Sequence, residues 1–74
     1  MQAVLIFLKA LASPVVLYAD QPLQLYEEMK MLMKGANPQH PKLIEKPGNG
    51  PLKKVAFFDT ELAGVALQSE PPTV

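Results

Sequence analysis

The sequence predicts an α+β fold. We expect a single small domain with the element order β-β-α-β-β-β, in which one helix packs on one face of a curved antiparallel sheet. Two observations predict this. Residues 20–35, DQPLQLYEEMKMLMKG, have a clear helical period, and apolar strand-like runs separated by turn residues lie on both sides of them. We expect the domain to span residues 1–70 and residues 71–74 to form a flexible C-terminal tail.

The length and composition predict a small core with apolar surface left over. A chain of 74 residues buries only about 60% of its unfolded surface, so its stability is marginal. It has no cysteine, so no disulfide or thiolate-bound metal adds stability, and we expect a cytoplasmic protein. Because 49% of the residues are hydrophobic and only 19% are charged, apolar surface can remain exposed after the core has formed.

The charge balance argues against a nucleic-acid partner. Seven lysines balance seven acidic residues, and there is no arginine to make bidentate contacts to phosphate or guanine. A chain with zero net charge also lacks the electrostatic attraction that dominates affinity for nucleic acids.

Residues 1–19 are apolar except for Gln2, Lys9 and Ser13, and three interpretations are open. A transmembrane helix has the required length, but Lys9 at mid-span would cost about 2.5–3.5 kcal/mol and Pro14 would interrupt the helix. A signal peptide would explain Ala10-Leu11-Ala12, but no basic residue precedes the short apolar run. We favour a β-hairpin with strands at 3–9 and 15–19 and a connection at 10–14.

The predicted helix has start and stop signals as well as an apolar face. Asp20 can cap its N-terminus and Pro22 fits its first turn. Lys34 suits the C-terminal end, and Gly35 can adopt the left-handed conformation that ends many helices. The apolar face comprises Leu25, Tyr26, Met29, Leu32 and Met33.

The C-terminal half predicts three further strands. We expect a loop at 36–41 and a short strand at 41–46. A turn follows at 47–51, and its prolines make it wider than two residues. The last two strands are expected at 53–59 and 63–69, joined by a corner at 59–62. The strands at 3–9 and 15–19 are apolar on both faces, whereas one helix covers one face of a sheet. We therefore expect the other face to be closed by a barrel-like core, a partner or a second copy.

The order of these elements resembles a family of small, uncharacterised cyanobacterial proteins. The similar residues are Pro14-Val15-Val16-Leu17, Leu25-Tyr26, Lys34-Gly35, Lys53-Lys54-Val55 and, most closely, Thr60-Glu61-Leu62-Ala63-Gly64-Val65. The similarity extends from about residue 4 to residue 70, and the turn at 47–51 departs from the family pattern. The resemblance implies this architecture and no catalytic activity.

No residue pattern indicates catalysis or a bound cofactor, so we expect neither an enzyme nor a metal or cofactor site. His40 lies between prolines in a loop with no acidic residue nearby, and the glycines at 47–51 lack the context of a phosphate-binding loop. The best polar cluster is at the corner, where a turn role is favoured over a partner contact. The candidate partner contacts are Met31, Asp59, Thr60 and Glu61.

These observations predict a small non-enzymatic interaction or structural module. We expect it to self-associate, as a homodimer, or to bind a protein partner through apolar sheet surface. The alternative is a small membrane-associated protein anchored by residues 1–19.

Overall fold

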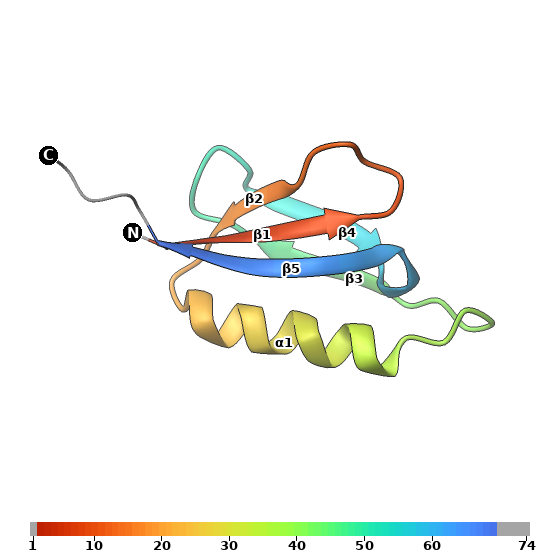
Figure 1. The fold of residues 1–74 in the computed structure, drawn as a ribbon. Helices are drawn as coiled ribbons and strands as arrows, with labels where there is room; N and C mark the ends of the chain where they lie inside the picture. The colour runs from red at the N-terminus through yellow and green to blue at the C-terminus, as the bar shows by residue number, and fades with distance from the viewer. Residues whose placement is uncertain (1, 70–74) are drawn as a thin grey trace, which may run out of the picture.

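The computed structural model describes residues 2–69, apart from the side chain of Ser69, and has the predicted α+β class and element order (Figure 1). The last predicted segment, residues 71–74, lies outside the described residues, as does residue 70. The elements in chain order are β1 (Gln2–Leu8), β2 (Val15–Tyr18), α1 (Pro22–Gly35), β3 (Leu43–Pro47), β4 (Lys54–Phe58), the 3₁₀ turn η1 (Asp59–Glu61) and β5 (Leu62–Ser69).

The N-terminal apolar segment forms the predicted β-hairpin. β1 pairs antiparallel with β2 on one side and with β5 on the other, so the most apolar strand of the chain is the central one. Strands occupy the positions where the transmembrane and signal-peptide interpretations required a helix. Within the described part of the chain, no helix is long and apolar enough to cross a membrane.

The five strands divide into two antiparallel sheets, a three-stranded sheet of order β2-β1-β5 and the hairpin β3-β4. Alternate residues of β1 point to the core, so Val4 and Ile6 are fully buried. Leu17 of β2, Met29 of α1 and Phe57 of β4 are buried in the same cluster. The inner face of the larger sheet is therefore covered jointly by α1 and the β3-β4 hairpin, and the core lies between them.

The helix begins with Pro22 in its first turn and ends at Gly35, as predicted, but both of its caps differ from the sequence expectation. Gln21 is its N-cap and makes no side-chain capping bond, so the prediction for Asp20 was wrong. The Asp20 carboxylate instead accepts a hydrogen bond from Asn49 Nδ2 at 2.5 Å. No described glycine has a positive φ, so the left-handed conformation predicted for Gly35 was also wrong; the Ala36 N–H bonds to the Met33 carbonyl at 3.4 Å.

The connection between β3 and β4 is wider than a two-residue turn, as predicted. It spans residues 48–53 and is held by a hydrogen bond from the Gly48 N–H to the Lys53 carbonyl at 2.9 Å. A side chain at Gly48 would overlap Leu17 and the Leu52 carbonyl, so only glycine fits this close approach. The Asn49 N–H donates to the Tyr18 carbonyl at 2.7 Å, which ties this connection to the end of β2.

Candidate interaction surfaces

The outer face of the three-stranded sheet is an apolar surface. On β1 the residues that alternate with the core positions are Ala3, Leu5 and Phe7. Leu5 has Val16 of β2 directly opposite on one side and Ala66 of β5 on the other. The residues of this outer face are Ala3, Leu5, Phe7, Val16, Tyr18, Gly64, Ala66 and Gln68, and none of them is charged.

Solvent exposure shows that this outer face is incompletely covered. Phe7 is 39% exposed and Val16 is 37% exposed, whereas Val4 and Ile6, on the opposite face of β1, are fully buried. The small residues Gly64 and Ala66 on β5 leave that side of the face low beside the larger Leu5 and Phe7 on β1. The outer face is thus uncharged and uneven in height.

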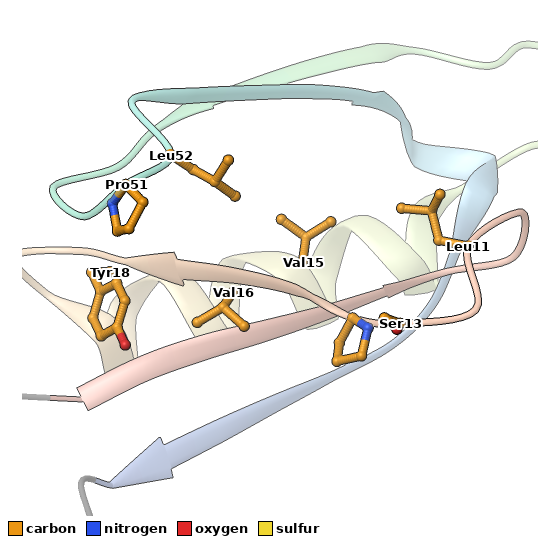
Figure 2. A pocket seen from close by; sticks show the side chains of 8 residues that line it. Leu11, Ser13, Val15, Val16, Tyr18, Pro51 and Leu52 are labelled. Carbon is orange, nitrogen blue, oxygen red and sulfur yellow. The ribbon is translucent and has the colours of Figure 1, made fainter.

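A groove lies beside β2, between this strand and the connection that precedes β4. Its volume is about 500 Å³. Figure 2 shows Leu11, Val15 and Leu52 pointing into the space between β2 and the connection, while Val16 points to the other side of its strand. The residues that line the groove are uncharged: Leu11, Ser13, Pro14, Val15, Val16, Tyr18, Pro51 and Leu52.

The corner cluster predicted from the sequence forms the 3₁₀ turn η1, and its central interaction is structural. Asp59 is only 3% exposed. Its Oδ1 accepts a hydrogen bond from the Lys42 N–H at 3.0 Å, and its own N–H donates to the Lys42 carbonyl at 2.9 Å. Asp59 therefore fixes the start of β3 beside the end of β4, which agrees with the turn role that the sequence favoured for this corner.

A smaller cavity brings part of the predicted contact set together. Asp59 and Thr60 line a cavity of about 250 Å³ together with Lys9 and Met33. Met31 is not among its lining residues; it lies on the solvent side of α1 with 66% of its surface exposed. Glu61 is half-buried, and its carbonyl accepts a hydrogen bond from the Lys9 N–H at 2.9 Å. The structure thus places Met31 apart from the corner residues.

The sequence indicated the outer face only in general terms. It showed that the strands at 3–9 and 15–19 are apolar on both faces, which is the signal for this surface. The individual residues depend on the pairing of β1 with β5, which are far apart in the chain. The groove beside β2 was not predicted, because it requires Leu52 to lie near β2.

The titratable residues are dispersed. His40 is exposed in the loop after α1, and its N–H bonds to the Asn37 carbonyl at 2.9 Å. Among the described residues, no group of three or more histidine, aspartate or glutamate side chains is arranged to hold a metal ion. Glu28 pairs instead with Lys46 of β3, and Glu27 lies 3.5 Å from Lys30 on the helix surface.

Comparison of the chain with protein-family models, with curated proteins and with solved structures found no match in any of the three. The resemblance to small cyanobacterial proteins therefore stays a prediction.

Proposed function

We propose that this protein is a non-enzymatic interaction module that self-associates by packing the outer faces of two copies against each other. The observation that carries the proposal is the outer face itself. Its three strands present apolar side chains in adjacent rows, with Gln68 as its polar corner, and both α1 and the β3-β4 hairpin lie on the opposite side (Figure 1). Burial of such a face stabilises association by about 25 cal/mol per Å² before the costs of ordering are subtracted.

A second copy fits this face better than a charged partner. Because the outer face has no charged residue, two copies meet without placing like charges together and without desolvating an ion. The face is also uneven, with the large Phe7 beside Gly64 in the same chain, so the raised part of one copy can lie over the low surface at Ala66 of the other. A chain this short gains from burying further apolar area, because its own core is small.

The test is sedimentation equilibrium over a range of concentrations, with two matched lysine variants. Phe7→Lys places a charge on the outer face near the end of β1, whereas Met31→Lys replaces another exposed apolar residue, on the solvent side of α1. We expect Phe7→Lys to raise the dissociation constant of the dimer by at least about 30-fold and Met31→Lys to leave it unchanged. Far-UV circular dichroism checks that both variants fold.

Two results would contradict the proposal. The first is a wild-type mass equal to one chain at every concentration. The second is a loss of association in Met31→Lys but not in Phe7→Lys, which would assign the interface to the outer surface of the helix.

A further inference from the structure

We propose that the groove beside β2 binds an extended, uncharged peptide segment, which adds to the free edge of β2 as an extra strand. This site adjoins the outer-face interface and shares Val16 and Tyr18 with it. It uses the edge of the sheet and the groove next to that edge rather than the face.

The direction of the backbone groups shows which part of β2 is available. The Tyr18 carbonyl accepts a hydrogen bond from the Asn49 N–H, which lies outside the β1-β2 pair. Alternate residues of a strand direct their N–H and C=O groups to the same side, so those of Val16 also point away from β1. The Lys9 N–H donates to the carbonyl of Glu61, the residue just before β5. Counting back from Lys9, the odd-numbered residues of β1 direct their N–H and C=O groups toward β5, so the even-numbered ones face β2, which agrees with this assignment.

Within the described residues, no hydrogen bond from outside the β1-β2 pair reaches the Val16 N–H or carbonyl. These groups face the groove, so an occupant that supplies a backbone donor and acceptor there gains directional hydrogen bonds as well as apolar contact. The chain already uses this edge once, through the bond from Asn49 to Tyr18, which shows that a neighbouring backbone can approach β2.

The free edge of β2 is also less protected than that of β3. Natural edge strands commonly carry charges or proline, which discourage pairing with another chain. β3 has Glu45, Lys46 and Pro47, whereas β2 reads VVLY. Because β2 has four residues and its Tyr18 carbonyl already accepts the Asn49 N–H, the bound segment is short and pairs chiefly at Val16.

The lining of the groove sets the chemistry of the occupant. A strand added at β2 directs alternate side chains toward Val15 and Leu52 on one side and toward the outer face on the other. No charged residue lines the groove, so a charged side chain pointing into it would be desolvated without a partner. We therefore expect preference for apolar residues at alternate positions of the peptide.

The test is an NMR titration of the ¹⁵N-labelled protein with the peptide acetyl-VTVTV-amide. We expect shifts centred on the Val16 and Tyr18 amides and slower hydrogen exchange at Val16. Two matched peptides, acetyl-VTKTV-amide and the same VTVTV peptide with its central amide N-methylated, should each bind at least about tenfold more weakly. The first tests the apolar lining and the second tests strand pairing.

Two pairs of protein variants make the test specific. Val16→Pro removes the outward N–H, whereas Val16→Ala shortens the same side chain and keeps it. Leu52→Glu places a charge in the groove, whereas Leu43→Glu places one on an exposed position of β3. We expect Val16→Pro and Leu52→Glu to weaken binding at least about tenfold relative to their controls. Phe7→Lys should bind the peptide normally, even if it disrupts the outer-face dimer.

The proposal is overturned if the NMR signals of the Val16 and Tyr18 amides do not shift at peptide concentrations up to about 5 mM, because the dissociation constant would then be too high for specific binding. It is also overturned if the N-methylated peptide binds as well as the parent, since apolar contact alone would then explain the binding. If Val16→Pro does not fold, the comparison of Leu52→Glu with Leu43→Glu and the exchange rate of the Val16 amide still decide it.

Discussion

At the scale of single residues, Asp59 has the most specific structural role. Its buried carboxylate accepts the Lys42 N–H, and these two residues also share a backbone bond. Asp59→Ala leaves that N–H without its acceptor, so we expect the free energy of unfolding to fall by about 1–3 kcal/mol. Asp59→Asn keeps an acceptor oxygen, so its cost should be below about 1 kcal/mol. Urea denaturation monitored by circular dichroism measures both.

The neighbouring Glu61 provides the control for this prediction. The Glu61 side chain takes no part in the hydrogen bond between Asp59 and Lys42. We therefore expect Glu61→Gln to change the free energy of unfolding by no more than about 0.5 kcal/mol. Equal losses for the alanine and asparagine variants at Asp59 would show that the Lys42 bond is not what the carboxylate contributes.

Residue-level expectations succeeded where the partner was local and failed where it was distant. The tight corner at 59–62 was predicted from adjacent residues and forms η1. Asp20 has the chemistry of a helix cap, but its carboxylate binds Asn49, which is 29 positions away. A capping pattern in the sequence cannot reveal this alternative hydrogen-bond partner, because Asn49 reaches Asp20 only after the β3-β4 connection has packed against the end of β2.

At the scale of elements, α1 is an amphipathic helix whose methionines differ in role. Met29 is fully buried among Val4, Ile6 and Leu17, whereas Met31 lies on the solvent side. Met29→Ala should therefore lower the free energy of unfolding by about 2–5 kcal/mol, because it removes buried contacts and leaves a cavity. Met31→Ala should change it by no more than about 0.5 kcal/mol. Guanidinium denaturation of the two variants side by side provides the measurement.

This pair also separates two interpretations of the methionines in α1. If they were chiefly an adaptable binding surface, Met29→Ala would be tolerated about as well as Met31→Ala, and that outcome would contradict the packing described here.

The elements themselves were predictable, but their grouping into sheets was not. Alternation and turn residues located all five strands, with ends shifted by one or two positions, as for β1, which ends at Leu8 rather than at residue 9. Nothing local indicates that β5 pairs with β1 while β3 and β4 form a separate hairpin. That division depends on the shared core, in which Phe57 packs with Leu17 and Met29.

At the scale of the whole molecule, the division into two sheets determines which apolar surface is left uncovered. The hairpin and α1 together cover the inner face of the larger sheet, so no described element remains on its outer side. A small domain with an uncovered apolar face is marginal as a monomer and gains stability from association. If the outer faces of two copies pair as proposed, folding and self-association are coupled.

This coupling predicts a melting temperature that depends on protein concentration. When two native chains bind each other and unfolded chains do not, each tenfold increase in concentration stabilises the dimer by about 1.4 kcal/mol, or about 0.7 kcal/mol per chain. For a domain of this size, that raises the melting temperature by about 3–5 °C. Thermal melts at several concentrations should show this rise in the wild type and in Met31→Lys but not in Phe7→Lys. A wild-type melting temperature that stays constant over the same range would mean that the folded chain is stable without a second copy.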